Sequence, residues 1–186
     1  MKTAFPLMLA AAGLALLAGC GKTDEAAVGV PGTAGADYCK ANLLGAAAIA
    51  DTAACAGCVV NGHAAAVDND PRTFAVLTFI DAGGTIGLRA VAANGRSFPA
   101  RAEAGALIRF PAGSAEEMSV RFNTYLAGQP VDRLLGGESA SGALRPDQEV
   151  FYTVTPTRPF DALEAVVTVR GGETAAVRVH EFCAER

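Results

Sequence analysis

Most of this chain alternates between apolar and polar residues with a period of two. The alternation starts near Val59 and is clearest at 163–169, where Leu, Ala, Val and Val occupy every second position. Successive side chains of a β-strand point to opposite faces, so this period predicts strands with one face in a core and the other in water. The chain from Val59 onward is therefore expected to be mostly β-structure.

Short strands separated by turn residues predict the architecture. The candidate strands are short runs punctuated by Gly, Pro, Asn and Asp, and no long amphipathic helix lies between them. The candidates are 73–80, 85–92, 106–110, 118–125, 149–155, 163–169 and 175–183. Gly136-Gly137 and Gly171-Gly172 fit hairpin turns. This organisation predicts an all-β antiparallel sandwich over residues 59–186.

Two segments precede the predicted sandwich. Residues 21–36 are small and polar without periodicity, which is typical of a flexible tether. Residues 37–54 are rich in alanine and include Leu43, Leu44 and Ile49. They predict either a short helix or an irregular cap held by disulfides, at the start of a Cys-containing segment that spans 37–58.

The N-terminus has the layout of an export signal. Lys2 precedes an apolar run, 4–17, that is too short to cross a bilayer core of ~30 Å as a helix. The run ends in Leu17-Ala18-Gly19-Cys20, which resembles the lipobox of bacterial lipoproteins at each of its positions.

The lipobox resemblance implies a signal peptide at 1–19, removed by cleavage before Cys20. It also implies a diacylglyceryl thioether on Cys20, usually with an N-linked acyl chain such as palmitate, and a tether at 20–36. Acyl chains anchor the protein in a membrane, and Gly21, where inner-membrane retention favours Asp, points to the outer membrane by the same resemblance. The alternative is an ordinary secretory signal with Cys20 near its cleavage site by chance.

Four cysteines remain once Cys20 is acylated: Cys39, Cys55, Cys58 and Cys183. An even number in an oxidising compartment predicts two disulfides of unknown connectivity. The Cys55-Ala56-Gly57-Cys58 motif could instead be a redox pair or half of a zinc site. A redox pair is expected at a helix N-terminus in a βαβ frame, and zinc needs a second close pair of ligands. The sequence has neither, so structural disulfides are the preferred interpretation.

Charge and composition narrow the range of partners. Lys and Arg form no cluster that could follow a phosphate backbone, and the net charge is -4, so we do not expect nucleic-acid binding. Tryptophan is absent, so a sugar-stacking surface would have to use Tyr or Phe.

One loop carries candidate metal ligands. Asp68, Asp70 and Thr73 lie in a tight segment just before a predicted strand. Their hard oxygens suit calcium, which takes about six to eight oxygen ligands and would need further partners. The alternative is a solvated turn, which Asp, Asn and Pro form readily without a metal.

The segment 65–74, AAVDNDPRTF, resembles the signature at the start of discoidin and galactose-binding-like jelly rolls. The resemblance implies a jelly-roll sandwich with a structural calcium, held by Asp68, Asp70 and Thr73, by backbone carbonyls and by a glutamate on the final strand. Ala65 departs from the family pattern, as does the lack of a tryptophan near Phe74-Ala75. Both departures affect the expected site for an external ligand such as a sugar, rather than the expected calcium site.

Glu181, in the pair His180-Glu181 on the last predicted strand, matches the closing glutamate of that family. Glu181 also shares strand parity with Val177 and Val179, which predicts that its side chain points inward. A buried carboxylate near a strand end needs a compensating cation. The predicted calcium ligands are therefore Asp68, Asp70, Thr73 and Glu181.

Two further motifs resemble a domain that recurs in bacterial cell-surface proteins. One has the form TYxxG and lies in 123–129, and the other has the form PFD and lies in 158–161. Together with the loop signature, these resemblances cover 59–186. They imply a cell-surface location and a fold more than an activity.

No catalytic constellation is predicted. His63 and His180 have no serine or free cysteine in a nucleophile elbow to activate. Glu116 and Glu117 precede a strand, and neighbours on one strand point to opposite faces, so they do not form an acid–base pair. We therefore expect that the chain is not an enzyme. A hydrolase is the less favoured hypothesis.

These observations predict a lipid-anchored binding or adhesion module of the cell envelope, for a glycan or an envelope protein. Its site is expected in loops at one end of the sandwich. Candidate contact residues are polar or aromatic residues on strands: Arg109, Arg121, Tyr125 and Tyr152. The alternative is an envelope structural or assembly lipoprotein that recognises another protein through an exposed sheet edge.

Overall fold

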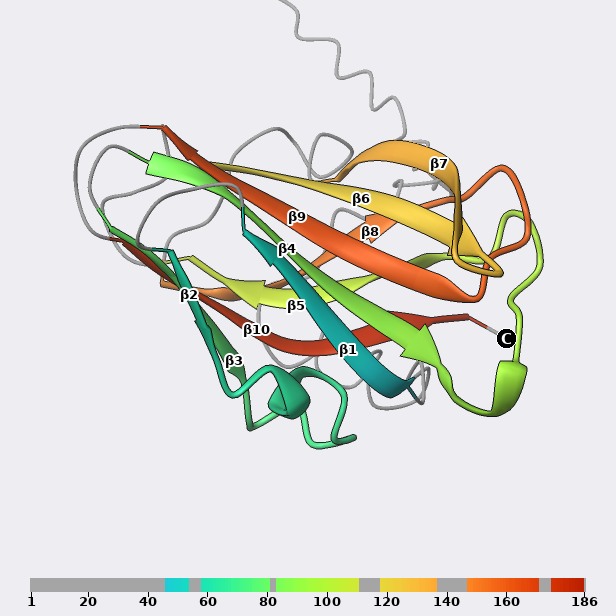
Figure 1. The fold of residues 1–186 in the computed structure, drawn as a ribbon, viewed down its shortest axis with the longest axis horizontal. Coiled ribbons are helices and arrows are strands. Elements are labelled where there is room, and N and C mark those ends of the chain that lie inside the picture. Colours follow the sequence, from blue (N-terminus) through green and yellow to red (C-terminus); the bar gives the residue numbers. More distant parts are fainter. Residues whose placement is uncertain are drawn as a thin grey trace, which may run out of the picture.

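The two-layered architecture is visible in Figure 1. The computed structural model describes residues 46–53, 58–80, 83–110, 118–136, 147–170 and 175–185. These residues form two five-stranded sheets, in which every strand pair is antiparallel. The predicted all-β antiparallel sandwich is confirmed.

Strands distant in sequence are neighbours in both sheets. The first sheet has the order β1 (Ala46–Ala53), β4 (Gly83–Ala92), β9 (Ala162–Arg170), β6 (Met118–Leu126) and β7 (Gln129–Gly136). The second has the order β2 (Val59–Asn61), β3 (Ala75–Phe79), β10 (Ala175–Ala184), β5 (Ala104–Arg109) and β8 (Glu149–Val154). Two short 3-10 turns, η1 (His63–Ala66) and η2 (Ala93–Gly95), lie in the connections.

The hydrophobic core lies between the sheets and is built from alternate residues of the central strands. On β9, Leu163, Ala165 and Val167 are fully buried in it. Phe122 of β6 and Phe182 of β10 are fully buried in the same core. The period of two therefore selects the core face, as the sequence predicts for a sandwich.

Every strand predicted from the alternation is present with slightly shifted ends, but three further strands are not predicted. The first of these is β1, which pairs along β4. For residues 46–53, the expectation of a helix or an irregular cap is therefore wrong. Alanine has a low strand propensity and gives no apolar–polar alternation, so only the pairing with β4 reveals the strand. The sandwich thus includes residues that precede Val59.

The other two unpredicted strands lie at sheet edges. β2 is three residues long, too short for a visible period. β7 contains Pro130, which is tolerated because β7 pairs with β6 only and lies at the edge of its sheet. Gly136 is the last residue of β7, whereas Gly137 and Gly171-Gly172 lie outside the described residues.

The TYxxG and PFD motifs contact each other. Ala127 and Gly128 have φ angles of 50° and 76° and form the two-residue turn that joins β6 to β7. The Asp161 N–H donates to the Tyr125 carbonyl at 2.8 Å, and the Asp161 carboxylate accepts from the Ala127 N–H at 2.8 Å. The end of the β6–β7 hairpin is therefore bound to the segment just before β9.

Most predictions for the N-terminal region concern residues outside the described ranges. These are the signal at 1–19, the tether at 20–36 and the cysteines Cys20, Cys39 and Cys55. Cys58 and Cys183 are each disulfide-bonded, while the connectivity stays a prediction. Within the described ranges, no helix combines the length and apolar character needed to cross a membrane.

Candidate functional site

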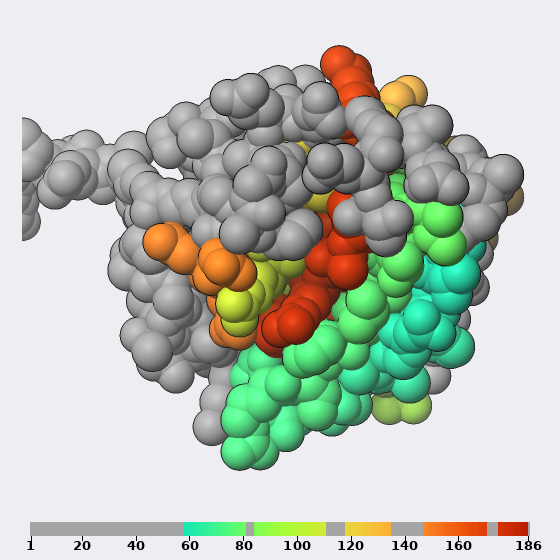
Figure 2. Space-filling view, turned by 90° about the vertical axis from the view of Figure 1, so that its left-hand side faces the viewer, coloured from blue at the N-terminus to red at the C-terminus, as the bar shows by residue number. Residues whose placement is uncertain are grey.

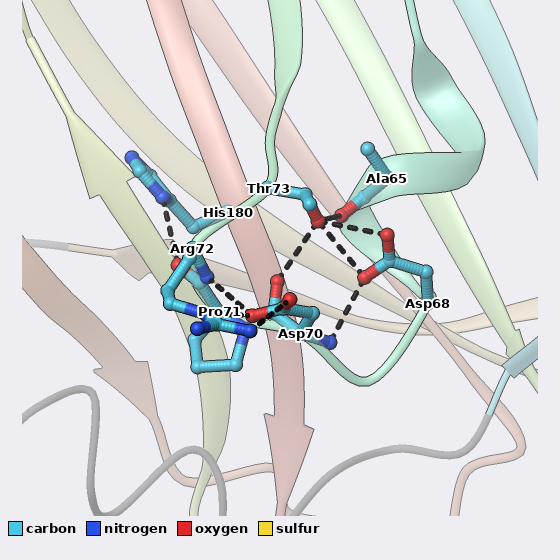
Figure 3. Close-up of polar contacts among 7 residues, drawn as sticks. All are labelled: Ala65, Asp68, Asp70, Pro71, Arg72, Thr73 and His180. Carbon is cyan, nitrogen blue, oxygen red and sulfur yellow. Dashed lines mark hydrogen bonds and ion pairs between the residues drawn. The ribbon is translucent and has the colours of Figure 1, made fainter.

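The loop between η1 and β3 folds around the side chains of Asp68 and Thr73, as Figure 3 shows. The N–H of Asp70 donates to Asp68 Oδ1 at 2.9 Å, which closes a tight turn through Asn69 with a φ of 67°. The N–H of Thr73 donates to the Asp70 carbonyl at 3.0 Å. Asn and Asp favour such turns because their side chains hydrogen-bond to nearby backbone groups and tolerate positive φ.

Oxygen atoms gather around the Thr73 hydroxyl (Figure 3). Its Oγ1 lies 2.9 and 2.8 Å from the two carboxylate oxygens of Asp68. It also lies 2.9 Å from the Asp70 carbonyl oxygen and 3.2 Å from the Ala65 carbonyl oxygen. A hydroxyl has one proton to donate, so it cannot satisfy this many acceptors at once. The cluster is rich in oxygen and poor in donors.

The Asp70 carboxylate is held by its neighbour rather than by this cluster. Arg72 donates from Nε to Asp70 Oδ1 and from a terminal nitrogen to Oδ2, both at 2.9 Å. Asp70 therefore contributes its backbone carbonyl to the oxygen cluster, whereas the sequence pattern suggested a side-chain ligand.

Glu181 is buried, with 1% of its surface exposed, but on the opposite face from the one predicted. A β-bulge between Val179 and Glu181 shifts the register of β10 against β5. After this bulge Phe182 and Ala184 point into the core, and Glu181 points to the outer face of the second sheet. The inward orientation expected from strand parity with Val177 and Val179 is therefore wrong, because one extra residue reverses the parity.

Glu181 lies against the Asp68 loop on that face. Figure 2 shows β10 in red between the yellow-green β5 and the green β3. Burial, and next the negative charge of Asp68, raise the pKa of Glu181 to about 8, although the backbone N–H groups of Asn69 and Phe182 donate to its carboxylate. The structure thus brings Asp68 and Thr73, near the start of the domain sequence, close to Glu181, near its end.

His180 attaches the same strand to the same loop. Its Nδ1 lies 3.0 Å from the Pro71 carbonyl oxygen (Figure 3), and its ring lies 5.2 Å from that of Phe74. A carbonyl only accepts, so the proton of the neutral ring is on Nδ1. Burial lowers the pKa of His180, against the opposing charge of Glu149, whose Oε1 lies 3.7 Å from Nε2. The side chain therefore holds the loop in place as a neutral group.

The donor set of this loop fits calcium by its chemistry. Among the described residues, no three His, Cys, Asp or Glu side chains are close enough to form a metal site. Calcium also accepts carbonyl and hydroxyl oxygens, however, and the loop supplies both kinds. The oxygens come from Asp68, Thr73 and Glu181 side chains and from the carbonyls of Ala65 and Asp70.

A second candidate site is a groove of about 280 Å³ on the outer face of the first sheet. It is lined by residues of β6 and β7: Arg121, Asn123, Tyr125, Pro130, Val131, Asp132 and Arg133. Arg121, Asn123 and Tyr125 alternate with core residues along β6 and so share the outer face. Arg133 is the cross-strand partner of Asn123, and Pro130 that of Tyr125.

Glu164 of β9 holds the groove side chains in position, and it is 4% exposed. Its Oε2 accepts hydrogen bonds from Asn123 Nδ2 at 2.8 Å and from the Tyr125 hydroxyl at 2.5 Å. Arg89 lies 3.7 Å from Glu164 Oε1, and its guanidinium lies 3.8 Å from the centroid of the Tyr125 ring. Burial and the bond to Glu164 raise the pKa of the Tyr125 hydroxyl above its ordinary value. Tyr125 is thus fixed from two sides.

The second carboxylate at the groove, that of Asp132, also accepts several hydrogen bonds. Asp132 accepts hydrogen bonds from the backbone N–H and hydroxyl of Thr157, each at 2.9 Å, and from the N–H and Nε of Arg158. Burial alone would raise the pKa of Asp132, but these donors hold it below its usual value. Asp132 therefore fastens β7 to residues 157–158.

The four contact residues proposed from sequence do not form one site. Arg121 and Tyr125 line the groove, whereas Arg109 of β5 pairs with Asp147 at 3.1 Å. Tyr152 is 2% exposed and packs edge-on against Phe110. The groove also lies on a sheet face, whereas the sequence predicted a site in loops at one end of the sandwich.

Several residues of the groove were not predicted from the sequence. Asn123 could have been found from its alternation with Arg121 and Tyr125, which places the three side chains on one face. Arg133 and Asp132 lie on a strand that the pattern did not predict, so no local signal identified them.

No protein-family model matches the chain, and no curated protein matches it. Solved structures with a similar arrangement include chitosan-binding module 1 derived from a chitosanase/glucanase of Paenibacillus sp. IK-5, with a TM-score of 0.45, 14% identity, and coverage of 78% of this chain and 98% of that chain. They include the family 32 carbohydrate-binding module from C. perfringens NanJ in complex with galactose, with the same four values. A third is CBM32-1 from a family 31 glycoside hydrolase of Clostridium perfringens, with a TM-score of 0.46, 12% identity, and coverage of 78% and 97%. The likeness is one of general architecture.

Proposed function

We propose that this chain is a non-catalytic binding module of the bacterial cell envelope, anchored through a lipidated Cys20, that binds a saccharide in the β6–β7 groove. The observation that carries the proposal is the groove itself, in which Glu164 holds Asn123 and Tyr125 in fixed positions. A site whose side chains are already ordered loses little conformational freedom when a ligand binds.

The chemistry of the groove suits a sugar. Tyr125 and Pro130 face each other across the hairpin and offer a flat apolar surface for the C–H face of a sugar ring. Arg121, Asn123 and Arg133 surround that surface with hydrogen-bond donors for hydroxyl oxygens. A few polar groups placed around an apolar surface are typical of small-molecule sites.

The same groove favours binding over glycoside hydrolysis. Hydrolysis of a glycosidic bond commonly uses two carboxyl groups that face each other across the substrate. The carboxylates here, Glu164 and Asp132, both accept several hydrogen bonds from protein donors. Such contacts hold side chains in place and compete with proton transfer to a substrate.

We further propose a structural calcium at the Asp68 loop. Asp68, Thr73 and Glu181, with the carbonyls of Ala65 and Asp70, would hold it. The ion would supply a positive charge beside the buried Glu181 and its neighbour Asp68, since burial, and next the negative charge of Asp68, raise the pKa of Glu181 to about 8. The loop would then be fixed against β10.

An outer-membrane location and two disulfides complete the proposal. Cys58 and Cys183 lie at opposite ends of the domain sequence and are each disulfide-bonded, which is consistent with an oxidising compartment. The tether at 20–36 would give the sandwich reach from the membrane surface.

The proposal is tested by screening the full-length chain, in a neutral detergent, on a glycan array. Asn123→Ala is compared with Ser119→Ala, which changes an exposed residue of the same strand outside the groove. We expect at least one glycan to bind to the wild type and to Ser119→Ala, with the signal at least about tenfold lower for Asn123→Ala. No glycan binding would refute the proposed function, and equal binding by both variants would refute the groove as the site.

A further inference from the structure

We infer that the groove recognises the carboxylate of an acidic saccharide through Arg121 and Arg133. The inference rests on the proposed saccharide-binding function and adds the charge class of the ligand. It is carried by the balance of charges around the groove.

The acidic groups near the groove are matched by their own cations. Glu164 has Arg89 at 3.7 Å, and Asp132 has Arg158 at 3.4 Å. Both carboxylates also accept neutral donors, so little of their charge is left for other partners. Their side chains are 5% and 11% exposed, so a ligand in the groove meets little of either.

Two arginines in the lining have no such match. Within the described part of the chain, neither Arg121 nor Arg133 forms an ion pair. The Nε of Arg121 is buried and has no hydrogen-bond partner there. The groove therefore carries an excess of positive charge in a chain whose net charge is -4.

The two arginines are placed to act on one group. Arg133 is opposite Asn123 in the β6–β7 register, and Arg121 is two residues from Asn123 on the same face of β6. Diagonal neighbours of this kind lie about 7–8 Å apart, a spacing that lets two long guanidinium side chains reach one anion. A guanidinium matches a carboxylate with two parallel N–H donors, so a carboxylate is the preferred anion.

The shape of the groove favours a sugar acid over an acidic peptide. Its volume of about 280 Å³ suits a single ring rather than an extended chain. Tyr125 supplies a rigid flat surface, since Arg89 and Glu164 both hold it. An acidic peptide would use the arginines but would have no use for this surface.

The test uses two matched probes, methyl galacturonoside and methyl galactoside, which differ in the carboxylate. Their dissociation constants for the full-length chain in neutral detergent are measured by ligand-observed NMR, together with a tri-glutamate peptide. We expect the galacturonoside to bind at least about tenfold more tightly than the galactoside, and its affinity to fall as salt is added. Arg121→Gln and Arg133→Gln should each weaken the galacturonoside at least about fivefold.

Controls separate charge from folding. Arg170→Gln removes the same charge from the exposed end of β9 and should leave affinity unchanged. If Arg121→Gln lowers the melting temperature, the role of the charge is judged from Arg133→Gln alone, because this variant changes an exposed side chain. Equal affinity for both sugars, lost in Asn123→Ala, would overturn the acidic preference and leave the proposed function standing. Binding of neither sugar would overturn the inference, and the glycan array then decides whether the proposed function fails as well. Tighter binding of the peptide would overturn the saccharide assignment.

Discussion

The Tyr125 hydroxyl lies 2.5 Å from Oε2 of Glu164, so that a residue of β6 and one of β9 share a short hydrogen bond on the outer face of the first sheet. This contact joins the buried carboxylate of Glu164, which also accepts from Asn123 and faces Arg89, to the ring that lines the groove. A hydrogen bond to an ionised acceptor is among the stronger ones in proteins, and removing one partner leaves the other unsatisfied.

That bond predicts the ionisation of Tyr125. Its hydroxyl should lose its proton at a higher pH than an ordinary tyrosine, because burial and the Glu164 carboxylate both oppose the phenolate. Glu164→Gln should lower the midpoint, and Tyr125→Phe should remove the step. Absorbance at about 295 nm, followed from pH 8 to 12, measures the phenolate. An unchanged midpoint in Glu164→Gln would contradict the role of the carboxylate.

The pKa of Glu181 predicts how stability changes with pH when calcium is removed. The unfolded glutamate loses its proton near pH 4.5, whereas the folded one keeps it to about pH 8. Between these values the native state binds more protons, so stability falls as pH rises, by at most ~1.4 kcal/mol per pH unit. Urea unfolding in EDTA at pH 5, 6.5 and 8 measures this fall.

Glu181→Gln and added calcium isolate that effect. The amide mimics the protonated side chain, so the variant should be more stable than wild type at pH 8 in EDTA. His180 acts in the opposite sense, since its lowered pKa adds stability as pH rises through the usual histidine range, and the difference between wild type and variant removes its contribution. Calcium should stabilise the wild type at pH 8 and leave Glu181→Gln nearly unchanged. If the melting temperature of the wild type is the same with added calcium as with EDTA, the proposed metal is excluded.

Gly105 predicts a packing limit between β5 and β8. A Cβ at this position would lie 2.0 Å from the Tyr152 carbonyl oxygen, so Gly105→Ala should force the strands apart and cost ~2 kcal/mol or more. Gly128→Ala is the matched control, since its φ of 76° strains the backbone by roughly 1–2 kcal/mol but no atom lies near the new methyl group. Urea unfolding at pH 7 compares the two, and a smaller loss for Gly105→Ala would show that the strands can adjust.

Lipidation of Cys20 predicts where the protein is found in a bacterial host. Wild type should incorporate labelled palmitate and enter the detergent phase on Triton X-114 partition, because acyl chains add ~0.8 kcal/mol of membrane affinity per buried methylene. Cys20→Ala should lose both properties, and Cys39→Ser should keep the label. Palmitate on Cys20→Ala would point to another acylated residue.

The period of two was enough to predict the sandwich and most of its strands, because one buried face imposes alternation on each strand. The period did not predict β1, because a run of alanines shows no alternation between apolar and polar residues. It also did not predict β7, which contains Pro130, a residue that a strand tolerates only at a sheet edge. Edge strands are defined by their neighbours, and this information is absent from their own residues.

The candidate sites were less predictable for a similar reason. Asp68 and Thr73 were identifiable as a local turn, but the face of Glu181 depends on a bulge that only the pairing with β5 reveals. Arg121 and Tyr125 were identifiable as strand residues, whereas Arg133 reached the same groove from an unpredicted strand. Local chemistry was visible in the sequence, while its assembly depended on strand register.

The β6–β7 hairpin is fastened at two places: Asp161 holds its turn, and Asp132 holds Thr157 and Arg158. Insertions in this turn would break the Asp161 contacts, so its length is constrained in a way that free surface loops are not. New specificity in this groove would therefore be gained by exchanging single side chains on a fixed platform, and an engineer who wishes to retarget it should vary residues 121, 123 and 133 while leaving the turn at its present length.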